Sequence, residues 1–279
     1  MDGREGIKSF RTQDGVSLYY KNWSSHDTAP CILYLHGLES HLGWFSNLAE
    51  FLNKNGMNIY AFDRRGSGLN KTAPGNFSSH IFSDVKSFID IIKKEHPDSP
   101  LFLIGLCLGG KVAVNFFSLY PNLFNGLILM SPSLKNRLKF SLFDKLTILL
   151  APRKSFKVPI EDDMFTQNRK YLDYIGKDPA RLRYVSGRFL LDVANMDRSI
   201  KHASRNIKLP TLLMLSGVDK IIDTDAVKRW FEKLPSGDKT IKVYKGYHHI
   251  LTFEEKAEEV MEDIVNWICM RAHAKSITS

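Results

Sequence analysis

The chain has little that would indicate a secreted or membrane-spanning protein. Its 279 residues include only three cysteines, an odd number at wide spacing: Cys31, Cys107 and Cys269. This usage argues against a disulfide framework or a zinc site and favours a reducing compartment. No apolar run approaches the ~18 residues that a membrane-spanning helix needs, and the opening MDGREGIKSF has no signal-peptide core. We therefore expect a cytoplasmic protein.

The sequence also lacks internal repeats and low-complexity stretches. Its 43% hydrophobic and 25% charged residues are typical of a folded globular protein. The formal net charge is +9, which admits nucleic acid, anionic lipid or an acidic substrate as a partner. No groove-reading motif is present and the positive charge is spread along the chain, so we expect no nucleic-acid partner.

What the sequence does contain is a regular alternation of strand and helix patterns. The segments GIKSF and VSLYYKNW alternate in the strand period around Asp14-Gly15, which predicts a β-hairpin. Helical patterns include Trp44 to Leu52, with Gly56 placed to cap the end, and the segments 81–95, 112–120 and about 254–272. A further helical pattern runs through Trp230 and Phe231. Apolar runs that are too short for helices predict buried strands at 31–35, 57–62, 101–106, 126–131, 211–217 and 240–246. Strands that alternate with helices predict crossovers in a parallel sheet, and therefore an α/β fold.

The alternation stops between residues 134 and 206. This segment has no clear buried strand, only helical stretches separated by prolines. A helical insertion between two strands of one sheet is a cap rather than a linker. The predicted organisation is a core built from residues 1–133 and 207–279, with a helical cap or lid at 134–206.

One predicted strand runs directly into the sequence Gly105-Leu106-Cys107-Leu108-Gly109. This pattern fits the nucleophile elbow G-x-S-x-G, with cysteine in place of serine. The elbow turns a strand sharply into a helix, so it needs small residues beside the nucleophile, and the helix N-terminus favours a thiolate. By itself the motif fits a small residue buried in a glycine turn equally well.

Two further candidate positions follow later strands. Asp219 comes just after the strand at 211–217, and the pair His248-His249 follows the strand at 240–246. The order nucleophile, acid, histidine belongs to the α/β-hydrolase fold. Three such positions at three strand ends predict a catalytic triad that contains Cys107, Asp219 and one of the two histidines.

On these stretches the chain resembles the α/β-hydrolases of the monoacylglycerol lipase and lysophospholipase type. The resemblance covers nearly the whole chain and depends on LHGLESH, FDRRGSGLN, the elbow, DDMFTQNRKYLDYIGKDPARLR, SGVDKIID and DKTIKVYKGYHHIL. It implies an α/β-hydrolase fold: a mostly parallel central sheet flanked by helices, with a helical cap inserted between strands.

The resemblance also implies roles for individual residues. Cys107 would be the nucleophile, Asp219 the acid and His249 the base, because the family places the base three residues after the glycine that ends the strand. Asp223 lies deeper in the loop and is the reserve acid. No metal or organic cofactor is implied, since the chain has no Cys/His cluster and no phosphate loop.

Two loops beside the triad are part of the same resemblance. The backbone N–H groups of Leu38 and Leu108 would form the oxyanion hole, because these residues follow His36-Gly37 and the nucleophile. Asp63 and Arg65 match a motif that shapes the neighbouring loop, where we expect structural ion pairing.

The chain departs from the family at Cys107, where relatives carry serine. A Cys–His pair ionises more readily than Ser–His and forms a thioester rather than an ester. We expect hydrolysis of a carboxylic ester in a lipid-like acyl substrate, of the monoacylglycerol or lysophospholipid type. Two alternatives stay open: an acyltransferase or thioesterase that uses the Cys107 thioester, and a non-catalytic scaffold that binds a ligand.

The first part of the cap is strongly basic. Phe140, Phe143 and Leu146 recur there at helical spacing, and a basic amphipathic helix with exposed aromatics can lie on an anionic membrane. This pattern predicts a peripheral membrane contact; the alternative is that the apolar residues pack the cap onto the core. The basic residues are Lys135, Arg137, Lys139, Lys145, Arg153, Lys154 and Lys157.

Overall fold

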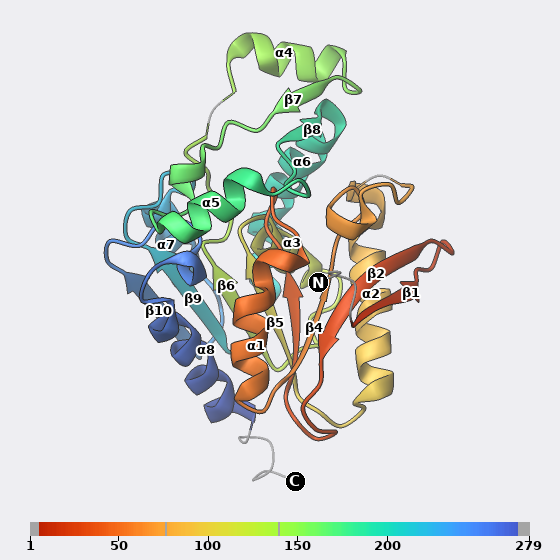
Figure 1. Ribbon diagram of the computed structural model, residues 1–279, viewed down its shortest axis with the longest axis vertical. Helices are drawn as coiled ribbons and strands as arrows, with labels where there is room; N and C mark the ends of the chain where they lie inside the picture. The colour runs from red at the N-terminus through yellow and green to blue at the C-terminus, as the bar shows by residue number, and fades with distance from the viewer. Residues whose placement is uncertain (1–5, 76, 139, 273–279) are drawn as a thin grey trace.

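The apolar runs of the sequence form one central sheet in the computed structural model, which describes residues 6–75, 77–138 and 140–272 (Figure 1). Its eight strands lie in the order β1-β2-β4-β3-β5-β6-β9-β10. The pairs β1/β2 and β2/β4 are antiparallel and all other neighbours are parallel, as predicted. The strands are β1 (Ile7–Arg11), β2 (Ser17–Trp23), β3 (Cys31–Leu35), β4 (Asn58–Phe62), β5 (Leu101–Leu106), β6 (Gly126–Met130), β9 (Thr211–Ser216) and β10 (Lys239–Tyr244).

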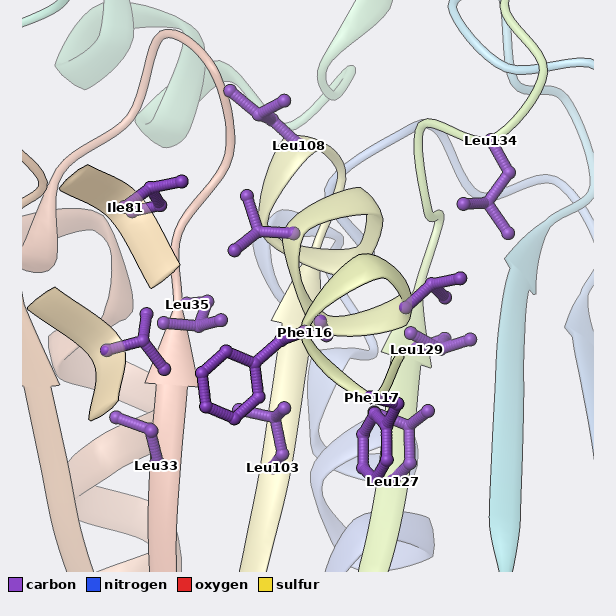
Figure 2. Close-up of a cluster of buried hydrophobic side chains, with 14 of the residues drawn as sticks. Leu33, Leu35, Ile81, Leu103, Leu108, Phe116, Phe117, Leu127, Leu129 and Leu134 are labelled. Carbon is purple, nitrogen blue, oxygen red and sulfur yellow. The ribbon is translucent and has the colours of Figure 1, made fainter. Parts of the chain in front are cut away.

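Helices cover both faces of this sheet because its central strands are apolar on both sides. Successive strand residues point to opposite faces, so Leu33 and Leu103 belong to one buried cluster and Ile32 and Phe102 to the other. Figure 2 shows the first cluster, with Phe116 and Phe117 beside leucines of β3, β5 and β6. On that face lie α2 (Phe77–Glu95), α3 (Leu108–Phe116) and α7 (Thr224–Glu232), and on the other lie α1 (Ser46–Lys54) and α8 (Ala257–Ala272).

The segment between β6 and β9 carries the elements above the sheet. It contains α4 (Leu142–Leu150), β7 (Ser155–Lys157), α5 (Arg169–Lys177), β8 (Tyr184–Ser186) and α6 (Gly187–Ala203). We refer to residues 134–206 as the cap. Figure 1 shows α4 at the end of the cap farthest from the central sheet.

From the sequence we had expected a purely helical cap. The structure corrects this, because the cap also contains two short strands. β7 and β8 pair antiparallel as a separate two-stranded sheet. Each strand has three residues and buries only its middle one, Phe156 or Val185. Such short strands leave no period-two pattern to detect.

Short 3-10 turns complete the structure: η1 (Leu42–Phe45), η2 (Gly68–Asn70), η3 (Asp162–Met164), η4 (Ser204–Asn206) and η5 (Leu251–Phe253). The helix predicted at 81–95 begins earlier, at Phe77, and the helix predicted at 112–120 begins at Leu108. Within the described ranges, no helix has both the length and the apolar character needed to cross a membrane.

Candidate active site

A sharp turn joins β5 to α3 at Cys107. This residue has φ 51° and ψ −113°, a conformation that L-residues rarely adopt and that is typical of strained functional turns. A Cβ atom on Gly105 would stand 2.7 Å from the backbone of Gly110, and one on Gly109 would stand 2.0 Å from the carbonyl oxygen of Leu35. The two glycines of G-x-C-x-G are therefore required by the close approach of the backbone, and the turn holds Cys107 at the carboxyl end of β5.

Asp219 and His249 form a buried pair at the carboxyl ends of β9 and β10. Nδ1 of His249 lies 2.8 Å from Oδ2 of Asp219. The other carboxylate oxygen accepts the backbone N–H groups of Ile221 and Ile222, both at 2.8 Å. With both oxygens engaged, the carboxylate fixes the orientation of the imidazole ring, and the second ring nitrogen is left for other chemistry.

That second nitrogen belongs to the same cavity as the cysteine. Nε2 of His249 is buried and has no hydrogen-bond partner among the described residues. His249 and Cys107 line one small cavity together with Leu38 and Phe165. The structure thus brings the three residues of the predicted triad together from three different strand ends.

The charges in this cluster shift two pKa values. Burial alone would lower the pKa of His249, but the charge of Asp219 and the interactions with Asp219 and Cys107 raise it to about 10. Burial alone would raise the pKa of Asp219. The charge of His249 and the hydrogen bonds that the Asp219 carboxylate accepts outweigh burial, so the pKa of Asp219 is lowered. An ionised acid and a histidine that readily holds a proton suit a cysteine nucleophile.

The two competing candidates have structural partners instead. Nδ1 of His248 lies 3.1 Å from Oε1 of Glu254, which also accepts the His248 backbone N–H. The Asp223 carboxylate accepts the N–H of Ala226 and caps α7. Among the described residues that line the cavities at Cys107, neither His248 nor Asp223 is found.

The predicted oxyanion donors lie on either side of the cysteine. Leu38 and Leu108 both line an apolar cavity with Cys107. A Cβ atom on Gly37 would stand 3.4 Å from Cβ of Cys107, so the loop that precedes Leu38 runs at contact distance from the nucleophile. Leu108 is the first residue of α3, where the backbone N–H has no intrahelical acceptor.

Arg64 holds the Leu38 loop, a role that the sequence analysis missed. Its guanidinium donates to the carbonyl oxygen of Gly37 at 2.7 Å and to the carbonyl oxygen of Leu38. The C=O and N–H of a trans peptide point in opposite directions, so fixing the Gly37 carbonyl also fixes the direction of the Leu38 N–H. No sequence motif could indicate this contact, because its acceptors are backbone carbonyls of a loop that is distant along the chain.

Asp63 and Arg65 are structural, but only one of them forms the expected ion pairs. Arg65 binds Asp14 and Asp84, each at 2.7 Å. Asp63 is fully buried and accepts two backbone N–H groups, from Leu42 at 2.7 Å and Leu69 at 2.8 Å. The one ion-pair partner found for Asp63 among the described residues is Nε2 of His36 at 4.0 Å, and burial holds the pKa of His36 well below its ordinary value. Backbone donors therefore hold Asp63 more closely than any charged side chain does.

An apolar cavity of about 400 Å³ extends from Cys107 into the cap. Its volume lies in the range of small-molecule sites. Most of the lining side chains are aliphatic, among them Leu138, Ile148, Val158, Leu190 and Val193. The described residues contain no group of three or more side chains suited to hold a metal ion.

Helix α4 forms part of this cavity and also presents apolar side chains to solvent. The exposed fractions are large for Leu142 (84%), Phe143 (75%), Leu146 (55%), Leu149 (63%) and Leu150 (76%). The alternative that this segment packs the cap onto the core is therefore wrong for Phe143 and Leu146. Of the predicted aromatic pair, only Phe140 lines the cavity.

The sequence had suggested that the basic residues of this segment belong to one amphipathic helix. In the structure they do not share one helix face. Only Lys145 lies within α4, and Arg153 and Lys154 follow it. Arg137 precedes α4 and donates to the carbonyl oxygen of Ile222 at 3.0 Å. Lys139 lies outside the described residues.

Comparison with known proteins gives consistent matches along the chain. Residues 26–256 match the family model described as serine aminopeptidase, S33. The chain is 27% identical to a monoglyceride lipase of Mus musculus, over 94% of this chain and 89% of that protein. It is 27% identical to a phospholipase of Bacillus subtilis, over 86% of this chain and 95% of that protein.

Solved structures agree with the fold. The crystal structure of a monoacylglycerol lipase from Paleococcus ferrophilus matches with a TM-score of 0.81 and 26% identity, over 91% of this chain and 99% of that chain. A monoglyceride lipase variant from Saccharomyces cerevisiae, in complex with a substrate analogue, matches with a TM-score of 0.83 and 23% identity, over 95% and 94% of the two chains.

Proposed function

The chain belongs to the serine aminopeptidase S33 family of α/β-hydrolases, and we propose that it hydrolyses the carboxylic ester of a monoacyl lipid, a monoacylglycerol or a lysophospholipid. The observation that carries this proposal is an apolar cavity of about 400 Å³ that ends at Cys107, beside the buried pair of His249 and Asp219. The relatives named as a monoglyceride lipase and a phospholipase, which match over most of their length, support a lipid ester as substrate.

Cys107 is the nucleophile in this mechanism. Nε2 of His249 takes the thiol proton, and the thiolate sulfur attacks the acyl carbonyl carbon. The carbonyl electron pair moves onto oxygen, where the N–H groups of Leu38 and Leu108 stabilise the negative charge. When this intermediate collapses, the C–O bond to the alcohol breaks, the alcohol takes the proton from His249, and a thioester remains on Cys107.

Water then releases the acid. His249 removes a proton from a water molecule whose oxygen attacks the thioester carbonyl, again with the oxyanion held by Leu38 and Leu108. The C–S bond breaks, the sulfur leaves as a thiolate, and the proton on His249 returns to Cys107. Asp219 keeps the ring oriented and stabilises its charged form throughout.

Arg64 acts in this mechanism as a positioning residue. Since its bond to the Gly37 carbonyl sets the direction of the Leu38 N–H, it determines how well one of the two oxyanion donors is aimed. It touches neither the substrate nor the sulfur, so it acts only through the loop.

The cap provides the route to a lipid substrate. We propose that α4 inserts its exposed apolar side chains into a membrane surface, as a peripheral contact. Leu149 is 63% exposed and also lines the cavity that ends at Cys107. An acyl chain can therefore leave the bilayer and enter the cavity beside the same helix.

The test is chemical trapping together with product analysis. The purified protein is given a monoacylglycerol or a lysophospholipid, and the released fatty acid is measured with and without an added alcohol, amine or thiol. Mass spectrometry of the quenched reaction should find the acyl group on Cys107, as a thioester cleaved by hydroxylamine. Transfer to the added acceptor in place of fatty acid would indicate the acyltransferase, and no adduct with no turnover would indicate the ligand-binding scaffold.

The other two cysteines serve as internal controls for labelling by iodoacetamide. Cys31 is buried, and burial raises the pKa of its thiol to about 12, so it should react slowly. Cys269 lies in the apolar stretch WICM, which predicts a buried thiol, but it is only half-buried. We expect Cys107 to react first, and an adduct that forms faster on Cys269 would contradict the assignment.

A further inference from the structure

We call the apolar cavity that extends from Cys107 into the cap the acyl cavity. A second depression lies on the other side of α6 from it. It has a volume of about 1070 Å³, and we call it the cationic groove. Leu190 and Val193 of α6 line the acyl cavity, whereas Arg188, Phe189 and Asp192 of the same helix line the groove. The groove is closed by the loop after β4 and by the turn after α4, and neither Cys107 nor His249 lines it.

Most charged side chains of the groove are positive. It contains a single carboxylate, Asp192, whose Oδ1 lies 3.3 Å from Nε of Arg188. Arg65 is neutralised by the carboxylates described above. Three cations remain for which no ion pair is found among the described residues: Arg64, Lys71 and Arg153.

Arg64 lies at the inner wall of the groove and is only 4% exposed. Its hydrogen bonds go to neutral acceptors, and its Nε has no partner among the described residues. Burial lowers the pKa of this guanidinium to about 10. The charge of the neighbouring Asp63 carboxylate opposes this effect of burial only in part. A buried cation is costly when its charge is not fully compensated, so an anion in the groove would stabilise Arg64 further.

We propose that the cationic groove binds the phosphate group of an anionic phospholipid in the membrane on which α4 rests. Leu150, at the end of α4, is 76% exposed and lines the groove, and Arg153 follows it within the same wall. The groove therefore opens on the face that α4 turns to the membrane. A headgroup can enter it while the acyl chains stay in the bilayer, and arginine and lysine suit phosphate oxygens by charge and by hydrogen bonding.

This inference rests on the proposed membrane contact of α4 but needs no chemistry at Cys107. Binding is therefore measured with the full chain carrying Cys107→Ala, by co-sedimentation with phosphatidylcholine vesicles, with and without phosphatidylglycerol. The groove variant is Lys71→Gln with Arg153→Gln. The matched control is Lys154→Gln with Lys157→Gln, which removes the same charge from exposed positions of the cap that do not line the groove.

We expect the groove variant to lose about tenfold more affinity for the anionic vesicles than the control does, because it loses phosphate hydrogen bonds as well as general attraction. Both variants should bind neutral vesicles like the parent protein. Equal losses in the two variants would mean diffuse attraction alone and would overturn the proposal, as would a parent protein that binds anionic and neutral vesicles equally.

Inorganic phosphate distinguishes a lipid headgroup from a free anion. At constant ionic strength, we expect phosphate to compete only weakly with the vesicles. If phosphate raises the melting temperature of the parent protein but not of the groove variant, while the vesicles do not discriminate between the two double variants, the ligand is a free anion and the lipid assignment is wrong. Turnover of a soluble short-chain ester by both double variants with Cys107 intact checks the proposed hydrolysis separately.

Discussion

The turn around Cys107 and helix α4 use leucine in opposite ways. Leu106 and Leu108, on either side of the cysteine, are 4% and 1% exposed, whereas Leu142 and Leu150, at the two ends of α4, are 84% and 76% exposed. Burying a leucine side chain is worth about 1.5–3 kcal/mol. Burial of leucine side chains stabilises the strained backbone of the turn. The leucines of α4 stay exposed, so their burial can stabilise contact with a partner instead.

The same contrast appears in the polar groups of the two regions. Around Cys107 the carboxylate of Asp219 is fixed by backbone N–H groups of its own loop, and the guanidinium of Arg64 is fixed by carbonyl oxygens of the Leu38 loop. At the start of α4, the hydroxyl oxygen of Ser141 accepts the backbone N–H of Asp144 and caps the first turn. A rigid catalytic turn and an adaptable apolar helix therefore lie at the two ends of one acyl cavity.

The sharpest test of the rigid region replaces the two neighbouring histidines in turn. His249→Ala should lower turnover of a soluble activated ester by several orders of magnitude, since removal of a triad member leaves only binding and the oxyanion hole. His248→Ala should lower it far less, because that ring contacts Glu254 and not the cavity. Steady-state kinetics with circular dichroism as a folding control decide the matter, and equal losses would mean that the histidine assignment is wrong.

A second test weakens the oxyanion loop without touching a catalytic residue. Arg64→Gln should lower kcat by about 10- to 100-fold, since loss of a single oxyanion donor costs roughly 100- to 1,000-fold. KM should change little, and Arg64→Lys, which restores one donor, should recover part of kcat. A purely structural role would instead lower the melting temperature with kcat per folded molecule unchanged.

The sequence was sufficient for the rigid region because its features repeat along the chain in order. The apolar runs predicted the parallel strands, and the strand ends placed Cys107, Asp219 and the pair His248-His249 at one edge of the sheet. The choice of His249 over His248 came from the family resemblance. Arg64 could not be found this way, because it binds carbonyl oxygens that only the folded chain brings near.

The sequence was less informative about the cap. Helical spacing of apolar residues says which side chains share a face, but not whether another element covers that face. Phe143 and Leu146 fit a packed helix and a membrane-facing helix equally well by spacing, and only the fold shows them exposed. The short strands β7 and β8 were missed because their pairing joins segments almost thirty residues apart in sequence.

A third test removes the exposed apolar surface of α4. Leu142→Ser together with Phe143→Ser should weaken binding to vesicles and turnover of a vesicle-borne monoacylglycerol by about tenfold, because both side chains would lose burial in lipid. Turnover of a soluble short-chain ester should be unchanged, since neither residue lines the cavity at Cys107. Equal effects on the two substrates would show that α4 supports the fold and not the interface.

The smallest expected effect concerns Glu39, which lies where the two regions meet. It follows Leu38 in the oxyanion loop, and its carboxylate binds Arg181 of the cap at 2.6 Å. Burial raises the pKa of Glu39 to about 7, although the charge of Arg181 opposes this, with Arg183 and Asp162 as further charged neighbours.

An acid whose pKa is higher in the folded than in the unfolded protein holds its proton more tightly when folded. The contribution of Glu39 to the free energy of unfolding is therefore complete below its ordinary pKa of 4.5 and is lost as the pH rises through about 7. Glu39→Gln should remove this loss, so the variant gains on the order of 1 kcal/mol relative to the parent between about pH 5 and about pH 8. Urea denaturation of both proteins at the two pH values measures the difference. If the difference has the opposite sign, the ion pair with Arg181 outweighs burial. The cap is then held to the oxyanion loop by an ion pair rather than by a hydrogen bond from Arg181 to the protonated acid.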